Sequence, residues 1–270
     1  MATEPVIGRF NNPQSLAQLT RGRGWNSELV GFLLPYARQN FIYKEYDFLE
    51  TAIGDDPNTD WSTDDGGGAS STGYATDANA EGGTISAHSG TDDNKGIALI
   101  HDSICLNPSA NPGIHVRMKI DDVSEVAHEM GMCDALTDES LVAVVDRGDS
   151  DYTIGNGLAA GVILGYDSDT TTQKGFDLVT EGATDGAEGV AVGSTTDANP
   201  IEDTVYFDVV IQAFANAGYA IMNHNLALSQ GLAVGPDADQ LMRYRIFTGT
   251  RGAAAVLPTI DLIRTWRERS

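Results

Sequence analysis

The chain has 270 residues, enough to bury one sizeable core in a single β-sandwich. Its formal net charge is −23, from 16 basic and 39 acidic residues. This balance argues against a nucleic-acid or anionic-membrane surface, because phosphate contacts need clustered Lys and Arg. The 30 glycines, with abundant Asp, Thr, Asn and Ser, are typical of an all-β protein with many turns.

The first 40 residues differ from the rest in charge. Four arginines against two glutamates give residues 1–40 a formal charge of +2, which leaves −25 for residues 41–270. Ser27 and the apolar residues after it predict a short helix within Trp25–Asn40, limited by Pro35. We predict either an arm that docks on a partner, including a neighbouring copy, or a helix that covers one end of the core. The candidate partner-binding residues of this arm are Arg9, Arg21, Arg23, Trp25, Phe32, Leu33 and Arg38.

Residues 41–270 are predicted to form the main domain, a sandwich of two antiparallel sheets with about ten to twelve strands. Residues 64–82 are polar and glycine-rich and predict a loop. The turn at 92–96 predicts that the strands on its two sides pair with each other. The predicted strands are 41–49, 82–90, 97–104, 114–120, 125–134, 158–166, 174–179, 205–212, 219–222, 242–246 and 259–266. Trp61 predicts either a further short strand or an anchor, and 190–192 is a candidate for another short strand.

The strand at 114–120 has the clearest alternation in the chain. Four apolar residues alternate with His115, Arg117 and Lys119, which indicates a strand with one buried face. The closing run, 204–267, also contains segments of alternating apolar and polar residues and is predicted to supply central strands. Its basic side chains predict internal ion pairs or a second contact surface, and they are Arg243, Arg245, Arg264, Arg267 and Arg269.

The sequence contains one pattern with catalytic potential. Glu45, Asp47 and Glu50 fit E-x-D-x-x-E, which in jelly-roll glucanases places carboxylates on one strand face as nucleophile and general acid. The segment opens the first strand and has few aromatic residues, so we favour a solvated strand face and predict no catalytic residue. Asp-rich turns such as 92–94 and 167–169 lack a complete Ca²⁺ loop, and we predict no metal and no cofactor.

The remaining chemistry-bearing residues are scattered. His115 and His128 fall on opposite kinds of strand face, and the five histidines have no metal-ligand spacing. Cys105 and Cys133 are predicted to be buried free thiols. The sequence shows neither a signal peptide nor an apolar run long enough to span a membrane. We therefore expect a protein that folds in a cytoplasm.

Several segments resemble tailed-phage virion proteins with a concanavalin A-like jelly roll. Gly82–Ser86 with Thr91–Asn94 is similar to an early hairpin of that family, and His115–Ile120 to the strand that follows. The turn at Asn223–Asn225 departs from the Asp-Gly turn of lectin-like relatives, which speaks against sugar binding. Further similar segments are Gly131–Leu136, Tyr206–Val209, Ala217–Ile221 and Thr259–Ile263.

The resemblance implies an all-β concanavalin A-like jelly-roll sandwich, residues 41–270, with residues 1–40 as the arm and short helix. It implies a virion structural protein that decorates and cements the outer surface of a bacteriophage capsid. The implied partners are the major capsid protein and other copies of the chain, with no enzymatic activity. Two alternatives stay open: a carbohydrate-binding or glucanase-like jelly roll, and a tail or baseplate component.

Overall fold

The computed structural model describes the chain from residue 41 onward, with gaps. The predicted short helix and all seven candidate residues of the N-terminal arm, Arg9 to Arg38, lie outside the described residues. The described residues are 41–46, 48, 60–66, 71–76, 83–93, 95–147, 152–155, 157–169, 175–182, 186–192, 201–223 and 225–268.

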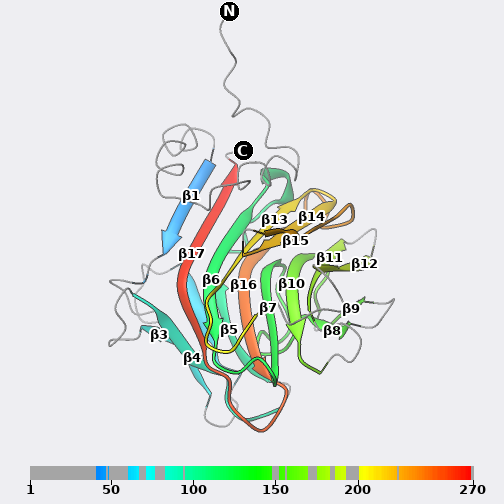
Figure 1. Ribbon diagram of the computed structural model, residues 1–270. Coiled ribbons are helices and arrows are strands. Elements are labelled where there is room, and N and C mark those ends of the chain that lie inside the picture. Colours follow the sequence, from blue (N-terminus) through cyan, green and yellow to red (C-terminus); the bar gives the residue numbers. More distant parts are fainter. Residues whose placement is uncertain are drawn as a thin grey trace, which may run out of the picture.

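The predicted all-β architecture is confirmed: two antiparallel sheets pack face to face (Figure 1). Within the described part of the chain, the first sheet has eight strands. Strand β1 (Phe41–Tyr46) pairs with the C-terminal half of β17, residues 263–268, whereas β4 pairs with residues 259–260 of the same strand. The other strands, in spatial order, are β15 (Asn225–Leu232), β14 (Ala217–Met222), β13 (Phe207–Phe214), β6 (Gly113–Ile120), β17 (Pro258–Glu268), β4 (Ile85–His88) and β3 (Thr72–Thr76).

The second sheet has seven strands among the described residues, and β8 (Val144–Arg147) and β9 (Tyr152–Ile154) form a separate small hairpin. The described helical structure is one 3₁₀ turn, Pro108–Ala110, and no described helix is long and apolar enough to cross a membrane. The seven strands, in spatial order, are β12 (Gly186–Val192), β11 (Phe176–Gly182), β10 (Gly161–Asp167), β7 (Val126–Cys133), β16 (Arg243–Thr250), β5 (Gly96–His101) and β2 (Trp61–Asp64).

The core lies between the two sheets, and strand alternation determines which residues enter it. On β6, the four apolar residues predicted to face inward are all buried there. They meet alternate residues of the opposite sheet, such as Met130, Ile246 and Leu164. Burying each such side chain contributes about 1.5–3 kcal/mol, so the alternation is what holds the sheets together.

The turn after β4 does not close a hairpin, which corrects the predicted pairing. Strand β4 pairs with β17 and β3, whereas β5 pairs with β16 and β2 in the other sheet. The physical reason is burial on both faces of β5. Ile97 and Leu99 enter the core, while Ala98 and Ile100 pack on the opposite side, which is covered in the seven-stranded sheet.

Three strands lie in segments for which the sequence predicts a loop, no strand, or a shorter strand. Strand β3 lies within the predicted loop at 64–82, β15 follows the turn at Asn223, and β12 extends the short strand predicted at 190–192. Each of these three strands lies at a sheet edge. An edge strand is defined by its pairing with one neighbour, so it shows little hydrophobic alternation of its own.

Candidate functional site

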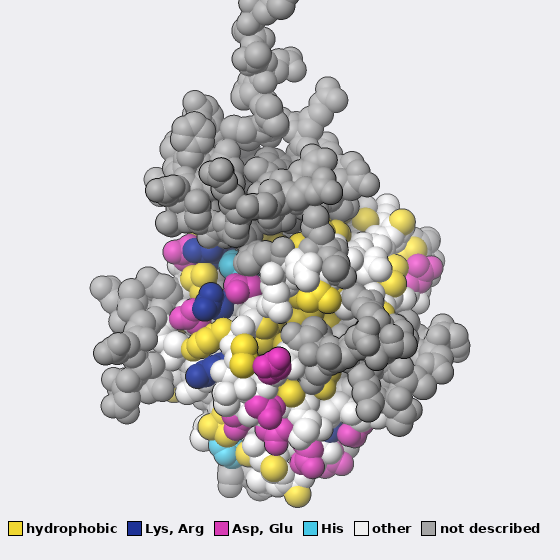
Figure 2. All heavy atoms as spheres, viewed as in Figure 1, with side chains coloured by type: hydrophobic (Ala, Val, Ile, Leu, Met, Phe, Trp, Pro, Cys, Tyr) yellow, Lys and Arg dark blue, Asp and Glu magenta, His cyan; other side chains and the backbone are white. Residues whose placement is uncertain are grey.

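The outer face of the eight-stranded sheet presents polar side chains from its central strands. Alternation on β6 turns His115, Arg117 and Lys119 away from the core, as predicted. Neighbouring strands add residues of both charges and one aromatic ring. Dark blue, magenta and yellow side chains intermingle over β17 and β6 in Figure 2. We call this set the charged stripe: Glu45, Arg117, Lys119, Tyr206, Asp208, Asp261 and Arg264.

Arg117 links three strands at the centre of the stripe. Its Nε lies 3.0 Å from Oδ2 of Asp261 on β17, and its Nη1 lies 3.7 Å from Oδ2 of Asp208 on β13. The other oxygen of Asp208 lies 2.8 Å from Nε2 of His115. The Arg117 side chain stays 45% exposed, so the guanidinium is positioned by its partners and still reaches solvent.

Tyr206 lies directly before β13, and two cations contact its ring. The guanidinium carbon of Arg117 lies 5.3 Å from the ring centroid, and the Lys119 ammonium lies 5.1 Å from it. Partial burial raises the pKa of Tyr206, the Asp261 carboxylate raises it further, and Arg117 opposes them. The phenol therefore stays protonated at neutral pH and can donate a hydrogen bond.

Glu45, the first residue of the E-x-D-x-x-E pattern, lies at the edge of the stripe. Its Oε2 accepts hydrogen bonds from Arg264 Nε at 2.6 Å and from the Tyr43 hydroxyl at 2.8 Å. Partial burial acts to raise the pKa of Glu45, but these hydrogen bonds outweigh it and the net shift is downward. Asp47 and Glu50 lie outside the described residues, so the structure places no pair of catalytic carboxylates from this pattern.

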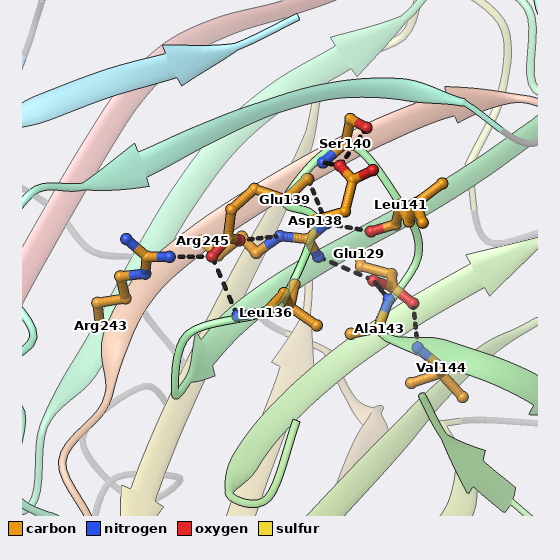
Figure 3. A network of polar contacts seen from close by, with 10 residues as sticks. All are labelled: Glu129, Leu136, Asp138, Glu139, Ser140, Leu141, Ala143, Val144, Arg243 and Arg245. Carbon is orange, nitrogen blue, oxygen red and sulfur yellow. Dashed lines mark hydrogen bonds and ion pairs between the residues drawn. The ribbon is translucent and has the colours of Figure 1, made fainter. Parts of the chain in front are cut away.

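The central part of the outer face of the seven-stranded sheet is covered by the chain itself. Residues 134–147 cross it, and Leu136, Ala143 and Val144 pack on outward side chains such as Ile163. Underneath lies a network of buried charges around Arg245 (Figure 3). Residues 134–147 therefore occupy this part of the seven-stranded sheet.

Arg245 is the centre of the buried network. Its Nη1 donates to Oε2 of Glu129 at 3.0 Å, and its Nη2 donates to the carbonyls of Glu139, at 2.9 Å, and of Leu141. Nε lies 3.2 Å from Oε2 of Glu139, an ion pair by distance without hydrogen-bond geometry. Glu129 also accepts the N–H groups of Ala143 and Val144 at 2.7 and 2.8 Å. The network thus fastens the covering segment to the sheet.

The arginines of the closing run mostly satisfy acidic or carbonyl partners inside the protein. Arg243 pairs with Glu139, Arg245 with two glutamates, and Arg264 with Glu45. Arg267 donates to the Cys105 carbonyl at 2.8 Å, and Arg269 lies outside the described residues. The predicted internal ion pairs are therefore present at three of the described positions.

The histidines occupy different environments. His115 belongs to the outer face, whereas His128 lies in the core, with Nδ1 2.9 Å from the Thr248 hydroxyl and its ring against Phe176 and Phe207. This confirms the predicted opposite faces. His101 packs edge-on against Trp61, and burial lowers its pKa. Among the described residues, no group of three or more His, Cys, Asp or Glu side chains is arranged to hold a metal ion.

Both cysteines are free thiols. Cys133 is buried under the covering segment, and this burial raises the pKa of its thiol to about 12. Cys105 is half-buried, which corrects the prediction that both are buried. Since the thiolate is the reactive form, Cys133 is suited to packing rather than to nucleophilic chemistry.

The sequence signalled part of these sites. It placed Arg117 and Lys119 on an outward face but did not single out Tyr206, Asp208 or Asp261. These residues could be recognised only from the strand pairing. Asp208 lies directly opposite Arg117 in the β13–β6 pair, and the sequence does not specify that register. It also singled out Arg245, between the core residues Tyr244 and Ile246, for either an internal ion pair or a second contact surface, and it did not identify Glu129 or Glu139 as partners.

No protein-family model and no curated protein matches the chain. Among solved structures, the laminarinase from Rhodothermus marinus is 11% identical, with 84% of this chain and 97% of that chain covered and a TM-score of 0.52. A protein of unknown function from Shewanella oneidensis MR-1 is 12% identical, covering 99% and 97%, with a TM-score of 0.50. Peanut lectin is 9% identical, covering 85% and 99%, with a TM-score of 0.49. At these identities the similarity concerns the fold, which is the concanavalin A-like lectin and glucanase sandwich.

Proposed function

We propose that the protein binds carbohydrate across the charged stripe and catalyses no reaction there. One observation carries the proposal: the half-buried Tyr206 ring is bordered by the Arg117 guanidinium, which the carboxylates of Asp208 and Asp261 hold in place. A sugar offers an apolar C–H face and a rim of hydroxyls. An aromatic ring beside charged donors and acceptors complements both.

The location of the stripe supports the proposal further. Its charged residues from Arg117 to Arg264 lie on β6, β13 and β17, which are paired central strands, Tyr206 directly precedes β13, and Arg117 is held from both sides. Residues fixed on strands lose little freedom when a ligand binds, which favours affinity. The likeness to the laminarinase supports the choice at the level of the fold alone.

A glycan array tests the proposal. We expect the wild-type protein to retain at least one glycan class, and Tyr206→Ala to weaken that binding at least tenfold, about 1.4 kcal/mol. Glu188→Gln, on edge strand β12 of the other sheet, is the control and should bind as wild type does. If no glycan is retained, or if Tyr206→Ala binds unchanged, the proposal fails.

We propose the virion structural role as a second candidate, because several segments resemble phage virion proteins, including His115–Ile120 in β6. In this role residues 1–40 dock on the capsid. Deleting them should abolish occupancy of purified capsids, measured by co-sedimentation. Unchanged occupancy would show that residues 1–40 are not the docking segment. If the full chain does not bind capsids, the virion structural role is refuted.

A further inference from the structure

Two cations share one aromatic ring in the charged stripe, and they are not equally compensated. Arg117 has carboxylates of Asp208 and Asp261 within reach, at 3.7 and 3.0 Å. The Lys119 ammonium has the Tyr206 ring as its contact and makes no ion pair with any described carboxylate. Among the described residues, a positive charge without a carboxylate partner therefore lies at this point of the sheet.

Arg117 also keeps donor capacity beside this charge. Its closest contacts to the two carboxylates are made by Nε and Nη1, and the side chain is 45% exposed, so part of the guanidinium still reaches solvent. A guanidinium and an ammonium that converge on one ring can both donate to a single anion. A carboxylate suits this arrangement because one of its oxygens can accept from the guanidinium while the other accepts from the ammonium.

The surroundings limit how much negative charge the ligand can carry. Asp208 and Asp261 flank Arg117, and the whole chain has a net charge of −23. At physiological salt, charges beyond about 8 Å are largely screened, but a second anionic group close to these carboxylates would be repelled. The same carboxylates accept hydrogen bonds from neutral hydroxyls.

We infer that the stripe selects a short glycan carrying a single carboxylate, seated on Lys119 and Arg117, with its hydroxyls toward Asp208 and Asp261. This inference rests on the proposed carbohydrate binding and names its ligand class. Terminal sialic acid and a single uronic acid share this chemistry.

Matched ligand pairs test the inference by NMR titration of the full chain at about 0.15 M salt. Methyl β-glucuronide is compared with methyl β-glucoside, and 3′-sialyllactose with lactose. Each pair contrasts an acidic sugar with a neutral counterpart, and the two pairs distinguish a uronic from a sialic source. We expect the acidic member of at least one pair to bind about tenfold more tightly or better, a factor that corresponds to about 1.4 kcal/mol.

Lys119→Gln should reduce that preference to within about twofold while leaving the neutral sugar unaffected, since it removes the charge and keeps most of the side chain. Lys95→Gln makes the same change at an exposed turn residue and should keep the preference. An unchanged thermal unfolding midpoint for Lys119→Gln shows that the fold is retained.

The outcomes separate the inference from the proposed function. If neutral and acidic members bind equally, or if Lys119→Gln keeps the preference, the carboxylate inference is overturned while carbohydrate binding stands. If neither pair binds and the array retains no glycan, carbohydrate binding itself fails. If the acidic sugar is lost in Lys119→Gln and the neutral one is not, the inference is supported.

Discussion

Replacing Arg245 by Met should destabilise the protein more than any substitution in the charged stripe. The change removes the cation that neutralises Glu129, which is 1% exposed, and that binds the carbonyls of Glu139 and Leu141. What remains is a buried carboxylate held by two backbone N–H groups but by no counter-charge from Arg245. Desolvating a charge without its partner is costly, whereas the Met side chain fills much of the vacated volume.

The magnitude follows from the burial of the pair. Removing one partner of a buried ion pair costs about 3–5 kcal/mol of the free energy of unfolding. In a domain of this size each kcal/mol lowers the thermal unfolding midpoint by about 2–4 °C, so we expect that midpoint to fall by about 6–20 °C. Adding Glu129→Gln should restore more than about 1 kcal/mol, because the amide keeps an acceptor for one N–H and carries no charge.

Urea unfolding followed by tryptophan fluorescence measures these differences. Arg117→Met is the matched control: its side chain is 45% exposed, and such a surface pair contributes about 0–1 kcal/mol. A loss for Arg245→Met no greater than for Arg117→Met would refute the reasoning. So would a double variant less stable than Arg245→Met alone, because relief of the buried charge would then not be the dominant effect.

Three further substitutions or conditions give distinct outcomes. Gly131 has φ +153°, and an added Cβ would lie 2.1 Å from the Val162 carbonyl, so Gly131→Ala should cost about 2–4 kcal/mol in the same unfolding assay; a cost below about 1 would contradict the close approach. Burial lowers the pKa of His101, so the unfolded chain binds more protons than the folded one just below pH 6.5. Stability should therefore fall as the pH drops below about 6.5, and His101→Gln should flatten this dependence in pH-series melts. A thiol reagent at about pH 8 should label Cys133 only on unfolding, since burial raises its pKa to about 12; equal labelling of native and unfolded protein would disprove this.

The fold was predictable wherever a strand had one buried and one exposed face. The strand at 114–120 shows this, because its period-2 pattern specifies both the strand and its orientation. Membership of a sheet was not predictable in the same way. The turn between β4 and β5 has strong turn residues, and these serve equally well for a hairpin and for a crossing between sheets. Which one forms depends on burial on both faces of β5, a property of the whole assembly.

The candidate site was likewise predictable only in part. Arg117 and Lys119 were predictable as outward residues of one strand, but Tyr206 and Asp261 reach that strand from about ninety and one hundred and forty positions further along the chain. Their juxtaposition depends on the pairing register of β13 and β17 with β6. A single sequence contains the residues of the stripe without stating their register.

Strand β17 bears on how the chain acquires its fold. It lies between β6 on one side and β4 and β1 on the other, and β1 pairs with no other described strand. Without β17, the sheet would separate into a part containing β6 and parts containing β4 and β1. Since β17 follows every other described strand in the sequence, a growing chain cannot complete this sheet until its last strand is synthesised. Until then β1, which precedes the other described strands in the sequence, has no strand to pair with, so a pairing between the earliest and the latest described strands completes the sheet.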